Sequence, residues 1–238
     1  EYPVIHNEQL AKLRSLPADS PFRSATLPML FDAEGDGDGL ANAMEDLCRR
    51  ATEAVAAGCD ILILSDRGAD LGQSPIPSLL ATAGVHHHLV REGTRTRCSI
   101  VVECGDAREV HHVCLLLGYG ASVVSPYVAI ETLEEMVQQG MLASVDREKA
   151  VQRYIKALNT GVLKVMSKMG ISALQSYRGA QIFEAIGLSR SFVDRYFTHT
   201  TSRVSGAGIE VIAAEVRLRH ERAFGASPAG TVELEEGG

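Results

Sequence analysis

The strongest constraint on the fold of this chain is the alternation of short, β-branched apolar runs with longer segments of helical periodicity. Apolar runs of four to six residues predict buried strands, and apolar residues spaced three and four apart predict amphipathic helices. Strands are expected over 26–31, 60–64, 99–103, 121–124 and 173–176. Helices are expected over 38–57, 77–91, 106–118, 129–139, 146–165, 178–186, 189–197 and 207–222. This order predicts an α/β fold whose βαβ units surround a parallel sheet.

Two architectures fit this alternation equally well. An open doubly wound sheet and a partial (β/α) barrel both consist of βαβ units joined by short turns. Five expected strands are too few for a closed barrel of eight.

Several residues are expected to mark where helices begin, bend and end. Asp38 is a candidate N-cap, and Gly58 a candidate stop, for the first long helix. Asp106 and Glu109 have the spacing of a capping box. The segment 159–161 is expected to break or kink the helix that contains it.

Charge and cysteine content restrict the partners. The net charge is −7, and the Lys and Arg residues are scattered, so neither nucleic acid nor an anionic membrane is an expected partner. No apolar run approaches the roughly 18 residues that span a bilayer, and no signal peptide is expected. The odd number of cysteines and the absence of CxxC spacing predict reduced thiols in a cytoplasmic protein. They are Cys48, Cys59, Cys98, Cys104 and Cys114.

Polar and charged side chains follow the expected strands. In parallel α/β folds, sites form beyond the carboxyl ends of the strands, so these residues are candidates for a functional rim or an interface. The alternative is that Asp66 and Arg67 form a structural pair and that Asp106 only caps a helix. The candidates are Asp66, Arg67, Glu103, Arg108, Ser125, Tyr177 and Arg178.

A histidine triplet and a histidine pair raise the possibility of a metal site. Imidazole suits zinc, and neighbouring helices could bring His86, His87 and His111 together. Consecutive residues of one helix point about 100° apart, however, so a triplet cannot give three ligands to one ion. Core histidines are therefore the favoured interpretation, and no metal site is expected.

No other motif predicts chemistry in this chain. The acidic run 32–38 resembles the start of an EF-hand loop, but position twelve is Ala43 rather than Glu. The chain has no GxxxxGK[ST] motif, no GxGxxG motif at a strand–helix junction and no GxSxG motif. The cysteine spacings do not match iron–sulfur motifs. No catalytic or cofactor-binding residue is expected.

Five sequence blocks carry a resemblance to a known family, the central domain of glutamate synthase. They occur in the family's order and cover 39–70, 75–97, 101–133, 164–188 and, more weakly, 196–213. The fourth block contains the run MGISALQSYRGAQIFEAIGL (169–188). The resemblance covers most of 26–213.

The resemblance implies a domain of the large (alpha) subunit of a glutamine-dependent enzyme that makes two glutamates from glutamine and 2-oxoglutarate. It implies a non-catalytic α/β domain, similar to an incomplete or degraded TIM-like (β/α) barrel. Such a domain connects an amidotransferase domain with an FMN-binding domain of the same polypeptide and helps to wall the ammonia path between them. The seven candidate residues are then expected at an inter-domain or ammonia-path face. FMN and an iron–sulfur cluster are implied for the full-length enzyme, and none for this part.

The resemblance also implies boundaries and partners. The central domain is expected over 1–224, with its upstream part missing, and a flexible linker toward the flavin domain over 225–238. A small electron-donor subunit belongs to the implied holoenzyme, but the electron donor itself is decided outside this segment. The alternative function is an independent α/β-barrel enzyme that acts on a small phosphorylated substrate at the carboxyl ends of the strands.

Overall fold

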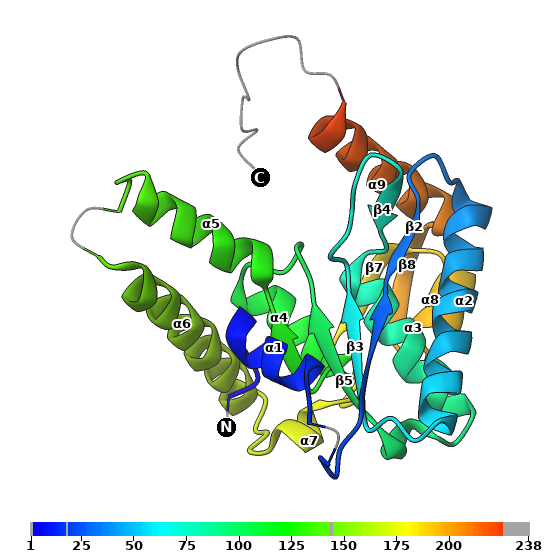
Figure 1. The fold of residues 1–238 in the computed structure, drawn as a ribbon. Helices are drawn as coiled ribbons and strands as arrows, with labels where there is room; N and C mark the ends of the chain where they lie inside the picture. The colour runs from blue at the N-terminus through cyan, green and yellow to red at the C-terminus, as the bar shows by residue number, and fades with distance from the viewer. Residues whose placement is uncertain (1, 18, 143–144, 226–238) are drawn as a thin grey trace.

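A parallel sheet of four strands organises the computed structural model, which describes residues 2–17, 19–142 and 145–225 (Figure 1). The order is β1 (Ser24–Pro28), β3 (Ile61–Ser65), β5 (Ser99–Glu103) and β6 (Val123–Ser125). This order follows the chain without reversing, whereas a doubly wound sheet reverses at a switch point. The predicted parallel sheet of βαβ units is thus confirmed, and its order is that of an incomplete (β/α) barrel. The described strands do not close into a barrel.

Each strand of the sheet leads into a helix. The helices are α2 (Gly37–Ala56), α3 (Ser78–Arg91), α4 (Val110–Gly118) and α5 (Tyr127–Gln138). Right-handed crossovers between strands that follow in order bring the connecting helices to the same face of the sheet, and α3 packs against both α2 and α4. The other face is covered by α1 (Asn7–Arg14), whose Leu10 packs on Ile63 and Val101.

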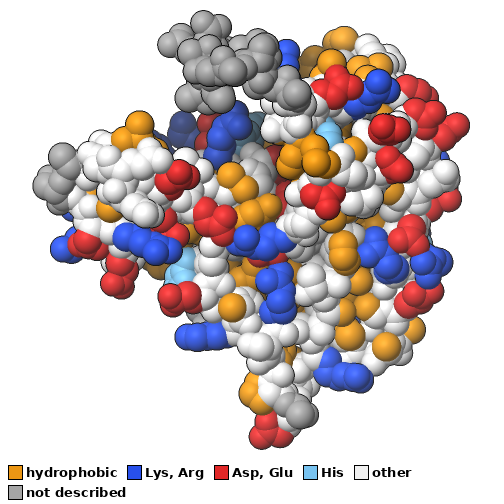
Figure 2. Space-filling model, turned by 45° about the horizontal axis from the view of Figure 1, so that its top comes forward, with side chains coloured by type: hydrophobic (Ala, Val, Ile, Leu, Met, Phe, Trp, Pro, Cys, Tyr) orange, Lys and Arg blue, Asp and Glu red, His pale blue; other side chains and the backbone are white. Residues whose placement is uncertain are grey.

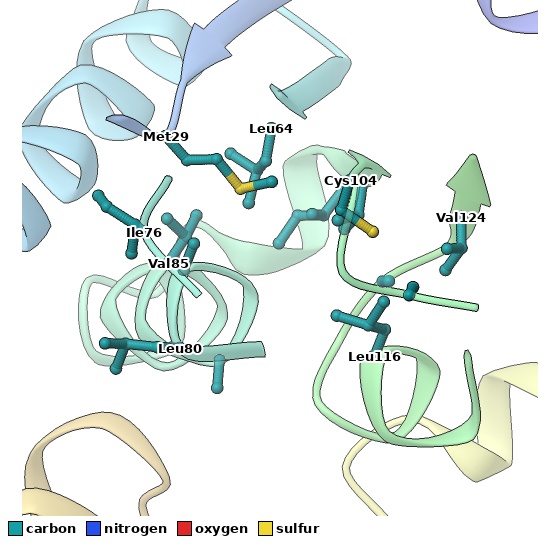
Figure 3. Packing of buried hydrophobic residues seen from close by; sticks show 14 of the residues in the cluster. Met29, Leu64, Ile76, Leu80, Val85, Cys104, Leu116 and Val124 are labelled. Carbon is teal, nitrogen blue, oxygen red and sulfur yellow. The ribbon is translucent and has the colours of Figure 1, made fainter. Parts of the chain in front are cut away.

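Alternation along the strands divides the core between these two faces. Leu62 and Leu64 belong to the large cluster under α2 and α3, whereas Ile63 between them belongs to the small cluster under α1. In Figure 3, Leu64 of β3 lies near Met29, and Val85 of α3 points toward them. Because both faces are apolar, the strands read as nearly continuous hydrophobic runs, as expected for a buried parallel sheet.

The remaining elements lie around this unit. β2 (Leu30–Asp32) and β4 (Gln73–Pro75) pair antiparallel beyond the carboxyl ends of β1 and β3. α6 (Arg147–Lys168) packs on α4 and α5, and α9 (Ile209–Phe224) packs on α2 and β4. β7 (Glu184–Leu188) and β8 (Thr201–Ala207) form a separate two-stranded parallel sheet. The other short elements are η1 (Arg95–Arg97), α7 (Leu174–Tyr177) and α8 (Arg190–Tyr196).

The chain start closes one edge of the sheet. Val4 forms an isolated parallel bridge with Val124 on β6, and the amide of Ile5 donates to the Val124 carbonyl over 3.1 Å. The Val4 amide donates to Oδ1 of Asn159 over 3.2 Å, which ties this segment to α6.

Three sequence predictions of elements were wrong. The expected strand 173–176 is the one-turn helix α7, and the expected helix 178–186 is a loop that leads into β7. The expected strand 26–31 is divided between β1 and β2 at Met29, whose amide donates to the Ser65 carbonyl over 2.8 Å. β2 and β7 pair with the distant strands β4 and β8, and this pairing overrides the local apolar character of those two segments.

Two helix-start predictions and the predicted break of a helix were also wrong. Asp36, not Asp38, caps α2 by accepting from the Gly39 amide over 3.0 Å. Asp106 lies before α4, which begins only at Val110, and instead accepts from the amide and hydroxyl of Ser78 at the start of α3. The segment 159–161 lies within an unbroken α6.

Two further observations concern the C-terminal segment and the capacity of the helices to span a membrane. The predicted linker 225–238 lies, apart from Gly225, outside the described residues. Among the helices that the structure describes, none combines the length and the apolar character needed to cross a bilayer.

Candidate functional site

The polar residues at the carboxyl ends of the strands divide between the two faces of the sheet. The register places Ser65, Glu103 and Ser125 side by side. They share the face that carries Ile63 and Val101, which is the face covered by α1. Asp66 follows Ser65 and lies toward the opposite side, where it lines a pocket beneath α9. The rim that the sequence predicts as one surface is therefore two.

Glu103 is the centre of the first group. Its side chain is 2% exposed. Oε1 accepts from Nε of Arg67 over 2.8 Å, and Oε2 accepts from Nη2 of Arg14 over 2.6 Å and from the Ser65 hydroxyl. Burial raises the pKa of Glu103, but the hydrogen bonds from Ser65, Arg67 and Arg14 outweigh it and hold this pKa below its ordinary value. Glu103 is therefore an ionised, fully engaged carboxylate rather than a proton donor.

Arg67 connects this buried centre to the surface. Its side chain is 39% exposed, and Nη2 donates to Oε1 of Glu131 on α5 over 2.7 Å. The guanidinium carbon also lies 4.0 Å from the centroid of the Tyr127 ring. Two carboxylates and an aromatic face thus fix the guanidinium in one position, with its outer side open to solvent.

Asp66 belongs to the second group. Its Oδ2 accepts from the Gly105 amide over 2.8 Å, and its Oδ1 is buried with no partner among the described residues. Burial raises the pKa of Asp66 to about 6, against the hydrogen bond from Gly105. The Tyr127 hydroxyl interacts with the same carboxylate, so Tyr127 touches both groups.

The pocket beneath α9 has a volume of about 280 Å³. Asp66, Asp106 and Tyr127 line its polar side, and Ile76 with α9 lines its apolar side. Figure 2 is turned toward this end of the sheet and shows acidic and basic side chains mixed over the face. No single sign of charge dominates it.

The other predicted rim residues lie elsewhere or are enclosed. Ser125 is fully buried, and its hydroxyl has no partner within the described part. Arg108 is exposed on the loop after β5, where its carbonyl accepts from the Tyr154 hydroxyl over 2.8 Å. Arg178 donates to the Ser122 hydroxyl over 2.9 Å, at the amino end of β6, and Tyr177 is fully buried beside it. Placing Tyr177 and Arg178 on the rim was wrong, because the segment before them is not a strand of the sheet.

The histidines of α3 point in different directions. Nδ1 of His86 accepts from Nε of Arg95 over 2.9 Å, whereas Nε2 of His88 bonds with the Thr52 hydroxyl over 2.9 Å. Burial lowers the pKa of His86 to about 3 and that of His87 to about 4. Within residues 2–17, 19–142 and 145–225, no three His, Cys, Asp or Glu side chains are grouped so as to hold a metal ion.

The sequence did not predict that Arg14 and Glu131 belong to the Glu103 group, or that helix α9 covers the pocket. Arg14 is separated from Glu103 by 89 residues, and Glu131 from Arg67 by 64. Helix α9 packs over β4, far away in the sequence. A charged last turn of a helix is the only local signal that could have pointed to Arg14.

The sequence of this chain is similar to part of several known glutamate synthases. The family described as "Glutamate synthase central domain" matches residues 1–189. The glutamate synthase [NADPH] large chain of Bacillus subtilis is 44% identical over 222 residues, covering 93% of this chain and 14% of that protein. The glutamate synthase [NADH] of Schizosaccharomyces pombe is 42% identical, covering 93% of this chain and 11% of that protein. The ferredoxin-dependent glutamate synthase 2 of Synechocystis is 39% identical, with 93% and 15% covered. The chain thus spans less than a sixth of the length of each.

Solved structures give a weaker likeness. The flavin-binding domain of baker's yeast flavocytochrome b2 matches with a TM-score of 0.47 and 15% identity, over 80% of this chain and 40% of that one. A mandelate oxidase variant matches with a TM-score of 0.41 and 19% identity, over 55% of this chain and 37% of that one. Both scores are below 0.5, so neither likeness supports a conclusion.

Proposed function

Because the chain belongs to the glutamate synthase central domain family, we propose that it is the non-catalytic linking domain of a glutamate synthase large subunit. In this proposal it connects the amidotransferase domain with the FMN-binding domain of the same polypeptide. It also helps to wall the path that carries ammonia from glutamine toward 2-oxoglutarate. A small electron-donor subunit is a further partner of the holoenzyme.

The single observation that carries the wall proposal is the fixed position of Arg67. A wall between two active sites must be rigid and must exclude water, since ammonia that reaches bulk water is protonated and lost. Arg67 is held from inside by Glu103 and from the side by Glu131, and its outer side stays open. We place the inter-domain face at Arg67 and the Tyr127 ring beside it. Asp66 belongs to the second surface, beneath α9. The buried Glu103 and Ser125 support this face from beneath.

FMN and an iron–sulfur cluster belong to other domains in this proposal. The described residues do not fit either group. The five cysteines are free, and no three metal-ligating side chains are grouped together in the described ranges. The pocket beneath α9 carries the carboxylates of Asp66 and Asp106, which repel a flavin phosphate. No reaction step is therefore assigned to a cofactor in this chain.

The experiment is a balance of nitrogen in a full-length polypeptide that contains this chain. The substitution Arg67→Ala should open the proposed wall. The number of glutamine molecules hydrolysed for each 2-oxoglutarate converted should then rise above one, and free ammonium should appear in solution. Arg49→Ala is the matched control, because Arg49 is an exposed arginine of α2 whose ion pairs among the described residues are with Asp46 and Glu53 of its own helix. A balance of one in Arg67→Ala would count against the wall.

The non-catalytic part of the proposal has its own test. The isolated 25.5 kDa chain should bind no added FMN and form no glutamate from glutamine and 2-oxoglutarate. A yellow protein that forms glutamate would overturn it.

The alternative, an enzyme acting on a small phosphorylated substrate, gains no support from the charges at the strand ends. A phosphate site needs cations or a free helix N-terminus. Here the start of α3 is already occupied by the carboxylate of Asp106. The linking domain therefore remains the proposal.

A further inference from the structure

Two arginines come together at the amino ends of the strands, and every acceptor that the structure gives them is neutral. Arg95 belongs to η1, just before β5, and Arg178 follows α7; both side chains are partly buried. In Figure 1 this is the end of the sheet where α7 lies, opposite the end that carries β2 and β4. We propose that the two guanidinium groups bind a phosphate group, either as inorganic phosphate or as the monoester of a small molecule. This site is separate from the rim at the carboxyl ends of the strands and independent of the proposed linking role.

Three neutral acceptors hold Arg95 in place. Its Nε donates to Nδ1 of His86 over 2.9 Å, its Nη1 to the Cys98 carbonyl over 2.6 Å and its Nη2 to the Gly120 carbonyl over 2.7 Å. Burial lowers the pKa of His86 to about 3, so the imidazole is a neutral acceptor near pH 7 and adds no charge of its own. Nη1 and Nη2 each keep a second N–H for a ligand.

Arg178 is held on the neighbouring turn by a hydroxyl. Its Nη1 donates to Oγ of Ser122 over 2.9 Å, and the next amide, that of Gly179, donates to the Gly118 carbonyl over 2.8 Å and so fixes the backbone. Nε of Arg178 is enclosed and is therefore closed to a ligand. Nη2 is not enclosed, and it has no acceptor among the described residues. Nη2 is the donor that this arginine can offer to an anion.

The two guanidinium groups are close enough to repel each other. Gly120 and Ser122, which accept from them, are separated by one residue, so their Cα atoms are at most about 7 Å apart. Burial lowers the pKa of Arg95, and the positive charge of Arg178 adds to this effect. Buried charges in proteins are normally paired with an opposite charge. An anion bound between the two arginines would supply that charge and remove the repulsion.

The charge and the donors of this site favour phosphate over a monocarboxylate. A phosphate monoester carries a charge of about −1.5 to −2 at pH 7 and three strong acceptor oxygens, which suits two neighbouring cations. The planar guanidinium group also matches the geometry of phosphate oxygens. The Ser122 hydroxyl accepts from Arg178, so its own hydrogen remains available to the same ligand. A monocarboxylate would compensate only one of the two arginines.

The test measures anion binding to the complete 238-residue chain by isothermal titration at constant ionic strength. The probes are inorganic phosphate, glycerol phosphate and acetate. At least one of the two phosphates should bind at least about tenfold more tightly than acetate, a difference of about 1.4 kcal/mol. Tighter binding of inorganic phosphate would identify the free ion as the ligand, and tighter binding of glycerol phosphate would identify the monoester. Equal binding of the two would mean that the phosphate group alone is recognised. The proposal fails if neither phosphate binds or if acetate binds as tightly as both.

A matched pair of variants tests the position of the site. Arg178→Gln removes one of the two guanidinium groups and should weaken phosphate binding at least about tenfold. Arg97→Gln is the control, because Arg97 is an exposed arginine of η1 and its loss changes the net charge equally. This control should weaken binding less than about twofold, since an exposed charge is screened by salt. Circular dichroism confirms that both variants are folded, and the comparison of probes on the unsubstituted chain depends on neither. Equal losses in the two variants, or unchanged binding in a folded Arg178→Gln, would contradict the assigned position.

Discussion

Arg67 reaches across the carboxyl end of the sheet so that its Nε lies 2.8 Å from Oε1 of Glu103, a carboxylate that is otherwise sealed beneath α1. The pair links the buried centre of the strand ends to the exposed guanidinium on the proposed inter-domain face. Two consequences follow for stability, since Glu103 is buried and its partners are partly exposed.

Glu103→Gln should destabilise the chain, because two arginines lose the charge that compensates them. Removing one partner of a buried ion pair is strongly destabilising. Both arginines are more than a third exposed, which reduces the loss to about 2 kcal/mol. Urea unfolding measures the difference. Glu131→Gln is the control, because it removes an exposed partner of Arg67 and should change stability by less than about 1 kcal/mol.

The pH dependence of Glu103→Gln has a defined sign. The pKa of Glu103 is lower in the folded chain than its ordinary 4.5. Its stabilising contribution is therefore present above pH 4.5 and is lost as the pH falls through the folded pKa. Wild type and variant should converge in stability as the medium is acidified below 4.5. A constant difference down to the lowest pH would contradict this assignment.

Asp66→Asn should have the opposite dependence. The pKa of Asp66 rises from 3.8 to about 6 on folding, mainly through burial. Protonation of Asp66 therefore stabilises the fold fully below pH 3.8, and this contribution is lost as the pH rises through about 6. Asn avoids the buried charge, so the variant should gain about 2 kcal/mol over wild type at pH 7.5 and nothing at pH 3.5.

Asp46→Asn is a control for that experiment, because its effect on stability at neutral pH should have the opposite sign. The hydrogen bond from Arg49 lowers the pKa of Asp46. Its substitution should thus reduce stability at neutral pH, and acid should erase the reduction. Unfolding curves at four or five pH values would distinguish the two patterns, and a loss of stability in Asp66→Asn at pH 7.5 would refute the prediction.

Gly120→Ala and Gly93→Ala should differ although both glycines follow a helix with positive φ. Gly120 has φ +116°, and a Cβ there would lie 2.4 Å from Nδ1 of His86. The imidazole would have to move off Arg95, so the total loss is about 3 kcal/mol. Gly93 has φ +70° and open space, so only the backbone strain of about 1 kcal/mol applies. Equal losses in thermal unfolding would show that His86 is free to move.

Gly161→Ala should destabilise α6 although alanine is the better helix former. A Cβ at this position would lie 2.3 Å from Cγ2 of Val110 on α4, so the loss is about 2 kcal/mol from overpacking. Val110→Ala removes the two closest atoms, Cγ1 and Cγ2, and leaves its Cβ, at 3.1 Å, as the remaining one of the three nearest contacts. In that background, Gly161→Ala should cost clearly less than in the wild type, and a double-mutant cycle measures the coupling. Additive losses would mean that α4 and α6 separate to admit the methyl group.

The sequence predicts the βαβ unit well because its signals are local. Apolar runs at 60–64 and 99–103 coincide with β3 and β5 almost residue for residue, since both strands are buried on two faces. The segment 173–188 fails for the opposite reason. β7 exists only because β8 pairs with it, and Gln181 adopts φ 54° in the loop before it. Neither fact is visible in a local window.

The same distinction between local and distant signals applies to the candidate site. Asp66 and Arg67 follow β3 directly, so their place at the strand ends could be predicted. The sequence could not show that neighbours in the chain belong to different surfaces, because that depends on α1 covering one face and α9 the other side. Tyr127 touches both Arg67 and Asp66, and only the folded chain reveals this.

The bridge between Val4 and Val124 also bears on self-association. An outermost strand with free amides and carbonyls is a template on which another chain can add a strand. Here Pro3 and Ile5 already use the amide and the carbonyl of Val124, so the outer border of β6 offers no such template at that residue. A chain trimmed ahead of His6 would uncover this border. Its concentration-dependent aggregation, rather than any change in activity, would then be the first sign that the opening residues belong to the sheet.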